Sequence, residues 1–375
     1  MSDFRASSPS FPRTIAAIEQ GIEKGDHLGA QVSIWRDGQP LADLAIGQVR
    51  PGEAMRPDHL HCWMSAGKPI TAVAIAQLIE RGKLQLDDRI ASFIPEFAAG
   101  GKQDITLRHL LTHTGGFRPV SNNWTPGPWE RIIERVCATP LEPGWIIGET
   151  AGYHVASSWF ILAEIIQRLT DRPFDQYVRA ELLEPLGMID TWIGMPHEQF
   201  LAYGGFDGRI APMFSTEVPP PAIKGMANTE AGCTVFRPGA NTRGPIRDLA
   251  RFYQMLLNGG QLNYHRMLSE SMVRQMTSRQ REKKLDLTFK RVIDWGFGFI
   301  VNSARYGDDG LPYGFGPHAS DNTFGHGGNQ SSCGLADPKH RIVAAWVCNG
   351  LPGELRHNFR VKAINAAIYE DFNCG

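Results

Sequence analysis

The sequence predicts an α+β fold, in which a central antiparallel sheet flanked by helices is built from both ends of the chain and an all-helical lobe lies between them. Three observations favour this fold. Strand patterns gather near the two ends, apolar residues at helical spacing open and close the chain, and Pro and Gly break the middle into short helical segments. We expect a discontinuous α/β domain of residues 1–95 and 220–375 and a mostly helical insertion of residues 96–219.

The first part of the chain is predicted to form a helix and then a hairpin. Isoleucines at helical spacing predict a helix over residues 13–24. Residues 31–35 and 40–49 are predicted as strands, because Asp37-Gly38 between them suits a tight turn. These two strands should therefore pair antiparallel.

The middle of the chain is predicted to contain short helices. Their expected positions are residues 107–112, 129–138, 157–169 and 174–183. Residues 203–245 are rich in Gly and Pro and show little periodicity. We expect a long surface excursion there, of the kind that often covers a binding site.

The last part of the chain returns to strands and closes with a helix. Strand patterns cover residues 295–302, 331–336 and 342–348, and Asp337-Pro338 marks a turn between the last two. Residues 357–372 carry apolar side chains at helical spacing. Both ends thus share one character, which is why we assign them to one domain.

Composition and charge exclude several classes of protein. The 375 residues are 42% hydrophobic and 21% charged, as in an ordinary globular protein. The net charge of −1 gives no electrostatic case for binding nucleic acid or an anionic membrane. No stretch approaches the roughly 18 apolar residues that a membrane span requires. We expect a small-molecule substrate, and these patterns leave the oligomeric state open.

The N-terminus and the cysteines favour a cytoplasmic location. The chain does not open with the cationic start and apolar core of a signal peptide. Its six cysteines are scattered and form no CxxC pair, which is typical of free thiols in a reducing compartment. We therefore expect a cytoplasmic protein with no metal and no other cofactor.

The segment Ser65-Ala-Gly-Lys68 is the first candidate for chemistry. It opens a strongly apolar helical pattern, so Ser65 and Lys68 would lie one turn apart on one side of a helix. In a dry site at a helix N-terminus, the lysine amine could be neutral and accept the serine proton. A serine N-cap followed by a solvated lysine has the same spacing, but a solvated face should carry more charge than this helix does.

Tyr153 stands just before a second apolar helical pattern and is the next candidate. Its phenol could exchange a proton with Ser65 or with a leaving group if a cation lowers its pKa. His154 could be the proton relay instead. The alternative without catalysis is a tyrosine whose hydroxyl makes a structural hydrogen bond.

The glycine-rich segment 324–334 is the third candidate and contains His326-Gly327-Gly328. Glycines in a strand let a ligand approach the backbone closely. Such an edge could offer a backbone N–H to an oxyanion beside the N–H of Ser65, and His326 could add a donor or a charge. A glycine bulge at a sheet edge is the structural alternative.

Signatures of other enzyme classes are absent from the sequence. Position 63 is Trp, so Ser65 does not lie in the G-x-S-x-G elbow of α/β-hydrolases. His109 and His113 have the i, i+4 spacing of zinc ligands but lack the glutamate of a zinc-protease motif. We interpret this pair as structural, with His113 as a candidate neighbour of the active site.

Taken in order, the motifs resemble the penicillin-recognising serine hydrolases, above all class C β-lactamase-like proteins and family VIII carboxylesterases. Ser65-Ala-Gly-Lys68 matches S-x-x-K, Tyr153 matches the tyrosine of Y-x-N, and His326-Gly327-Gly328 matches K-T-G or H-x-G. The resemblance covers roughly residues 15–350. Flanking phrases that also match begin at Leu107, Leu183 and Asp248.

The resemblance implies a role for each matched residue. Ser65 would form an acyl-enzyme, while Lys68 and Tyr153 would share the proton transfers. The N–H groups of Ser65 and Asn329 would form the oxyanion hole. The candidate substrate-binding residues are His326, Gly327, Gly328, Trp295, His154 and Phe117.

Two departures from the family pattern bear on the substrate. Val155 replaces the Asn of Y-x-N, whose amide contacts a β-lactam side chain, and His326 replaces a lysine that carries a fixed positive charge. Nearby aromatic residues, among them Trp63, Trp124 and Trp159, suit an apolar acyl or alcohol group. We expect a hydrolase of small, fairly apolar esters. The alternatives are an amide or β-lactam hydrolase, an acyltransferase, an acylated sensor and a non-catalytic binding protein.

Overall fold

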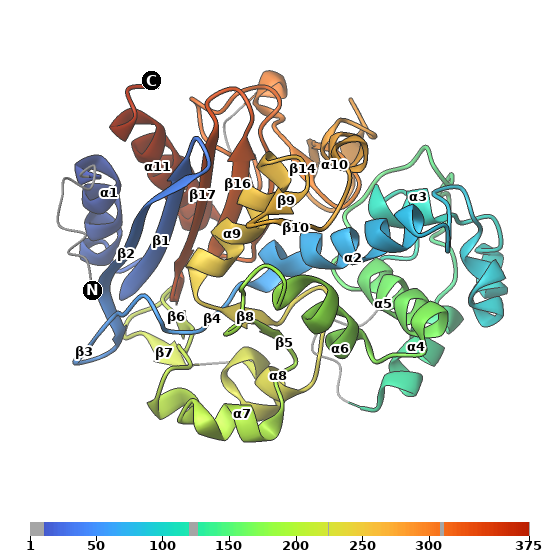
Figure 1. The fold of residues 1–375 in the computed structure, drawn as a ribbon, viewed down its shortest axis with the longest axis horizontal. Coiled ribbons are helices and arrows are strands. Elements are labelled where there is room, and N and C mark those ends of the chain that lie inside the picture. Colours follow the sequence, from blue (N-terminus) through green and yellow to red (C-terminus); the bar gives the residue numbers. More distant parts are fainter. Residues whose placement is uncertain (1–10, 120–126, 224, 308–310, 375) are drawn as a thin grey trace.

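A computed structural model describes residues 11–119, 127–223, 225–307 and 311–374 of the chain. At its centre, the described part forms an eight-stranded antiparallel sheet, in the order β13-β14-β15-β16-β17-β1-β2-β3 (Figure 1). These strands are β1 (Gly29–Arg36), β2 (Gln39–Arg50), β3 (Glu53–Ala54), β13 (Asp294–Trp295), β14 (Ile300–Val301), β15 (Phe324–Gly328), β16 (Ser332–Asp337) and β17 (Ile342–Cys348). The predicted α+β class with a central antiparallel sheet is confirmed.

The two ends of the chain meet in the middle of this sheet. β1 pairs antiparallel with both β2 and β17, and Ile34 lies opposite Ala344 of β17. All of β17 is buried because helices cover both faces of the sheet. Val343 packs into the core on the side of α9 (Ile246–Leu257), whereas Trp346 faces α11 (Glu354–Asp371) and donates its Nε1–H to Asn365 at 2.8 Å. The predicted N-terminal hairpin is thereby confirmed.

The helices divide between the faces of the sheet and a lobe to one side (Figure 1). α1 (Pro12–Glu23) packs beside α11 on one face, and α9 packs on the other. α2 (Lys68–Glu80) runs from the sheet toward the lobe and is buried on all sides from Lys68 to Leu78, which is why its sequence is apolar all round. The remaining helices are α3 (Leu107–Leu111), α4 (Trp129–Ala138), α5 (Ser157–Thr170), α6 (Phe174–Val178), α7 (His197–Ala202), α8 (Glu230–Thr234) and α10 (Glu270–Thr277).

Several short strands lie outside the main sheet. They are β4 (His61–Cys62), β5 (Trp192–Ile193), β6 (Phe214–Ser215), β7 (Ala222–Ile223), β8 (Thr242–Gly244), β9 (Gln261–Leu262), β10 (His265–Arg266), β11 (Leu285–Asp286), β12 (Arg291–Val292) and β18 (Gly350–Leu351). β5 and β6 pair with β8 and β18, which come from later in the chain. The proposed boundary of the insertion at residues 96–219 stays a prediction.

Three predicted elements differ from the structure. The strand predicted over 295–302 is a hairpin of β13 and β14, because Gly298 takes a φ of +80° and turns the chain back. The helix predicted over 174–183 changes to a π-helical turn after α6. The surface excursion predicted at 203–245 is wrong for its last part, since β8 is wholly buried between β4 and β5.

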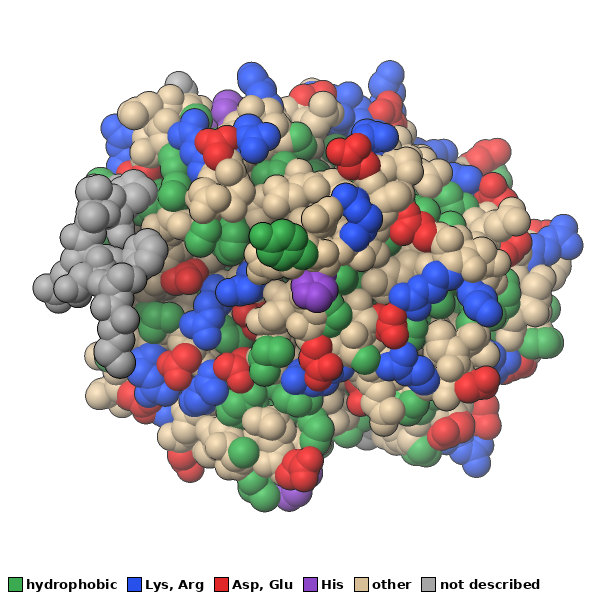
Figure 2. All heavy atoms as spheres, viewed as in Figure 1, with side chains coloured by type: hydrophobic (Ala, Val, Ile, Leu, Met, Phe, Trp, Pro, Cys, Tyr) green, Lys and Arg blue, Asp and Glu red, His purple; other side chains and the backbone are tan. Residues whose placement is uncertain are grey.

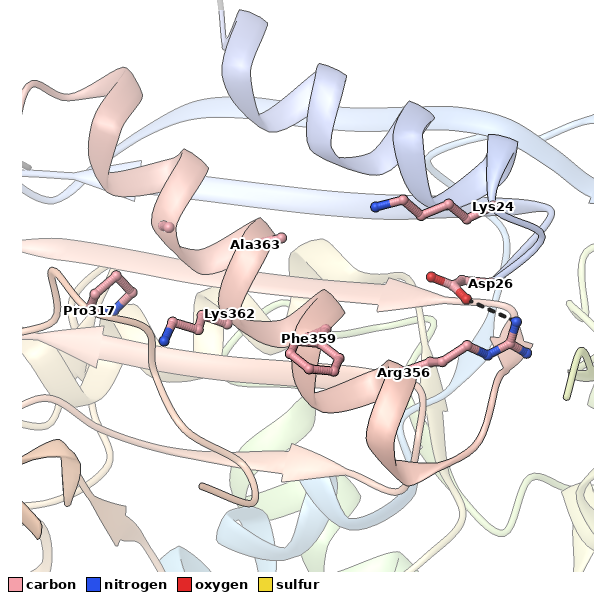
Figure 3. Close-up of a pocket in the computed structure, with 8 residues that line it drawn as sticks. Lys24, Asp26, Pro317, Arg356, Phe359, Lys362 and Ala363 are labelled. Atoms are coloured by element: carbon pink, nitrogen blue, oxygen red, sulfur yellow. Dashed lines mark ion pairs between the residues drawn. The ribbon is translucent and has the colours of Figure 1, made fainter. Parts of the chain in front are cut away.

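The surface carries charges of both signs and a groove between two helices. On the face shown in Figure 2, cationic and anionic side chains are interspersed. A groove of about 620 Å³ lies between α1 and α11 and is lined by Phe359, Lys24 and Arg356, the last paired with Asp26 at 3.4 Å (Figure 3). In the part of the chain that the structure describes, no helix is long and apolar enough to cross a membrane.

Candidate active site

Ser65 lies in a tight turn that leads directly into α2. Met64–Gly67 forms one 3₁₀ turn, and the α-helix begins at Lys68, so the helix predicted from Ser65 onward starts with this tighter turn. Met64 has a left-handed φ of +49°, a conformation that costs free energy in a non-glycine residue and must be held by its surroundings. Hydrogen bonds fix the preceding Trp63: its backbone N–H donates to the Thr242 carbonyl at 2.8 Å, its indole N–H donates to the Gly244 carbonyl at 3.0 Å, and its own carbonyl accepts from Ser332 Oγ at 2.7 Å.

The Lys68 amine lies 2.9 Å from the Ser65 hydroxyl oxygen. Its Nζ also donates to the Gly239 carbonyl, and the Tyr153 and Trp159 ring centroids lie 5.5 Å away. Lys68 is 0% exposed and Ser65 5% exposed. Burial holds the pKa of Lys68 well below its usual value, and no carboxylate in the described residues opposes that shift. A neutral amine here can donate to Gly239 and accept the Ser65 proton.

Tyr153 precedes α5 and presents its ring to the Lys68 amine. Burial raises the pKa of Tyr153 well above its usual value, Tyr313 adds to the rise, and the Ser65 hydroxyl opposes it. The sequence suggested a cation that would lower this pKa, and the structure shows the opposite direction. The phenol is therefore protonated at neutral pH. Its oxygen is buried and, within the described residues, makes no hydrogen bond that meets normal geometry.

His326 lies on β15 with its ring 5.9 Å from that of Tyr153 and 5.7 Å from that of Trp295. Burial lowers the pKa of His326 to about 3, and the nearby Lys68 contributes to that shift. Its Nδ1 lies 2.7 Å from the Gly327 carbonyl and must donate the hydrogen of that bond. In this neutral tautomer, Nε2 carries a lone pair and has no hydrogen-bond partner among the described residues.

The rest of the glycine segment approaches its neighbours closely. A Cβ on Gly327 would lie 2.2 Å from the Tyr313 ring, and one on Gly328 would lie 2.3 Å from the Trp63 carbonyl oxygen. β15 can therefore lie against the turn that carries Ser65 only without a side chain at Gly328, and Gly327 leaves room for the Tyr313 ring. Asn329 is exposed in the turn after β15. Its place in an oxyanion hole stays a prediction.

The other predicted substrate contacts are fully buried. His154, Phe117 and Trp295 are each 0% exposed. The His154 ring stacks 5.6 Å from that of His113 and lies 5.0 Å from that of Phe117. His113, expected near the active site, lies 4.9 Å from the Tyr153 ring. The roles of the three residues as substrate contacts stay predictions, and Trp124 lies outside the described residues.

Four neighbours of the site were missed in the sequence. Gly239 bonds to Lys68, Tyr313 packs on Gly327, Phe289 stacks on the Tyr153 ring at 4.9 Å, and the Asp286 carboxylate accepts from the Tyr153 N–H. None lies in a motif, and only the richness in Gly and Pro of the region around Gly239 gave any signal. Three of these contacts, those of Gly239, Phe289 and Asp286, join residues that are more than a hundred positions apart in the chain.

Comparisons with known proteins agree with this geometry. The model of the Beta-lactamase family matches residues 14–367. Esterase/beta-lactamase LipL of Mycobacterium tuberculosis is 24% identical over 93% of this chain and 83% of its own length. Esterase EstB of Burkholderia gladioli is 29% identical over 62% of this chain and 64% of its own. The crystal structure of a family VIII carboxylesterase superimposes with a TM-score of 0.79 at 26% identity, covering 99% of each chain.

Proposed function

Since the chain belongs to the Beta-lactamase family and is a serine hydrolase, we propose that it cleaves small carboxylic esters through an acyl intermediate on Ser65. One observation carries the proposal: a buried lysine amine, which has no carboxylate partner among the residues that the structure describes, lies 2.9 Å from the Ser65 oxygen. A serine hydroxyl is a weak nucleophile until a base takes its proton. Lys68 can be that base, because burial lowers its pKa and its amine lies within hydrogen-bond distance of the Ser65 oxygen.

The proposed reaction has two halves. Lys68 accepts the Ser65 proton as the serine oxygen attacks the ester carbonyl, and the N–H groups of Ser65 and Asn329 bind the oxyanion. Tyr153, protonated because of its raised pKa, donates its proton to the departing alcohol oxygen and is reprotonated by the Lys68 ammonium. A water molecule then attacks the carbonyl carbon of the acyl group and gives one proton to the same pair. The bond from this carbon to the Ser65 oxygen breaks, the pair returns the proton to that oxygen, and the free acid leaves.

The surroundings of Ser65 favour uncharged substrates. His326 stands where the family motif has lysine, and its pKa of about 3 makes it neutral at neutral pH. The Tyr153, Phe289 and Tyr313 rings lie together beside it. A neutral aromatic wall suits an apolar acyl or alcohol group better than a carboxylate. The names of LipL and EstB support an ester substrate.

Hydrolysis of a β-lactam or an amide, and acyl transfer to an alcohol, remain second candidates for the same residues. The printed name of LipL includes β-lactamase, and a solved neighbour is described as a hydrolase with promiscuous acyltransferase activity. A β-lactam substrate is less favoured, because Val155 replaces the asparagine of the family motif whose amide contacts a β-lactam side chain. The acceptor in the second half-reaction decides among these activities.

The cytoplasmic location also stays a proposal. It is supported by the six cysteines, all of which carry free thiols. Cell fractionation with antibody detection tests it, and recovery in the periplasm or the medium would contradict it.

A burst experiment tests the proposed reaction. With 4-nitrophenyl butyrate, we expect a burst equal to the enzyme concentration followed by steady turnover, and intact-mass spectrometry should show a butyryl adduct. Ser65→Ala should lose both burst and adduct. The matched control is Ser33→Ala, which changes another buried serine, on β1. Turnover retained by Ser65→Ala would refute the proposal, and a burst without turnover would indicate an acylated sensor.

A further inference from the structure

Tyr153 is held at its backbone by the hairpin of β11 and β12. Its N–H donates to Asp286 Oδ1 at 3.0 Å, and its carbonyl accepts from Thr288 Oγ1 at 3.0 Å. Ala151 forms an isolated bridge with Asp286 and accepts from the N–H of Leu287 at 2.9 Å. The hairpin therefore holds this segment at three points: the Ala151 carbonyl, the Tyr153 N–H and the Tyr153 carbonyl.

The Asp286 carboxylate is fully buried and paired with a fully buried arginine. Oδ1 also accepts the N–H groups of Thr288 and Phe289 at 3.0 and 3.1 Å, and Oδ2 lies 2.9 Å from Arg281. Arg281 donates in turn to the Thr112 carbonyl at 2.9 Å, next to His113. Such a pair is costly to bury, and replacing a buried ion pair by apolar residues of similar volume often costs a protein no stability. A role beyond packing would explain it.

Two aromatic rings stack on the Tyr153 ring. Phe289, on the turn of the same hairpin, stacks on the ring at 26° between planes, and Trp295 stacks at 22° with centroids 5.6 Å apart. Arg281 lies 5.3 Å from the Trp295 centroid. Because the phenol oxygen makes no hydrogen bond of its own in the described residues, these contacts and the backbone bonds set its position.

We propose that Asp286 and Arg281 are positioning residues that aim the Tyr153 phenol at the Ser65 oxygen and the leaving group. The proposal rests on the proton-donor role of Tyr153 in the proposed function. A proton donor must lie within hydrogen-bond reach of the oxygen it serves, and a displacement of about 1 Å can cost 10²-fold in rate. In Asp286→Asn the side chain keeps one acceptor oxygen, but an amide NH2 replaces the second oxygen. The pair with Arg281 that holds this side chain against the Tyr153 N–H is therefore lost.

The test compares Asp286→Asn and Thr288→Val on two esters. We expect Asp286→Asn to lower kcat about 10-fold or more for an alkyl ester, but less for a 4-nitrophenyl ester. Nitrophenolate leaves without a proton, so a misplaced donor matters less for it, whereas a general loss of structure would slow both alike. Thr288 is exposed, so Thr288→Val should fold normally and show a weaker form of the same pattern.

Two further variants separate the possible outcomes. In a Tyr153→Phe background, Asp286→Asn should cause no further loss of kcat, because no phenol is left to position. The matched control, Asp294→Asn, changes an equally buried carboxylate that is paired with Arg279 at 2.9 Å and should keep the wild-type ratio between the esters. Equal losses on both esters, or a full further loss in the Tyr153→Phe background, would refute the positioning role alone. Unimpaired Tyr153→Phe would refute the proposed function as well.

Discussion

Replacing Lys68 with methionine is the sharpest test of the proposed base. Methionine fills a similar volume but accepts no proton, so Lys68→Met should lower kcat by the 10²–10⁴-fold that a general base typically supplies, about 3–5 kcal/mol in activation free energy. The structure places the Lys68 amine 2.9 Å from the Ser65 oxygen, within hydrogen-bond distance. Steady-state hydrolysis of 4-nitrophenyl butyrate measures the loss.

The same substitution has a second consequence, for stability. The pKa of Lys68 is lowered in the folded protein from the ordinary value of 10.5. Between the folded and the unfolded pKa, the unfolded chain binds more protons, so wild-type stability rises with pH by about 1.4 kcal/mol per pH unit. The variant lacks this slope. It also leaves the Gly239 carbonyl without its donor, a cost of about 1–3 kcal/mol that does not depend on pH.

Urea denaturation from pH 7 to pH 10 tests the stability argument. The free energy of unfolding of wild type relative to Lys68→Met should increase as the pH rises from the lowered folded pKa toward the ordinary value of 10.5. Lys83→Met, on an exposed residue just after the same helix, should show neither effect. A difference that does not change with pH would mean that the amine is charged in the folded state. Near-normal kcat in Lys68→Met would refute the assignment of the base.

Three further predictions concern other buried groups. His326→Gln should leave the acidic limb of the kcat–pH profile in place, because a pKa of about 3 keeps His326 neutral throughout the assay range; a shifted limb would contradict its neutrality. Gly328→Ala should destabilise the fold by about 1–3 kcal/mol and lower kcat, since its Cβ would lie 2.3 Å from the Trp63 carbonyl oxygen; unchanged melting and kcat would contradict that contact. Asp248→Asn should stabilise the protein at pH 7 by up to about 3 kcal/mol. Burial raises the pKa of Asp248 from 3.8 to about 6, so the folded protein binds this proton more tightly than the unfolded chain does and loses stability as the pH rises between these two values. Thermal melts should show that gain vanish below about pH 4, and a gain that persists there would contradict the raised pKa.

The elements predicted well are those whose pattern is local. Asp37-Gly38 between two strand patterns predicts a hairpin whatever the rest of the chain does, and the apolar run after Lys68 can only be a buried helix. Where one residue overrides the pattern, prediction failed. Gly298 turns the segment 295–302 into two strands, and the buried strand β8 lies in a region whose glycines and prolines suggested the surface.

The sequence by itself determined the fold class, the S-x-x-K pair and the order of the three motifs. Ser65 and Lys68 are three residues apart at the start of a helix, and this spacing puts them on one side of the turn that leads into α2. Only the tertiary structure decided the chemical state of these groups. The pKa of Lys68 falls because distant segments, including Gly239, enclose it, and the pKa of Tyr153 rises for the same reason. Burial is a property of many segments packed together, so no local pattern records it.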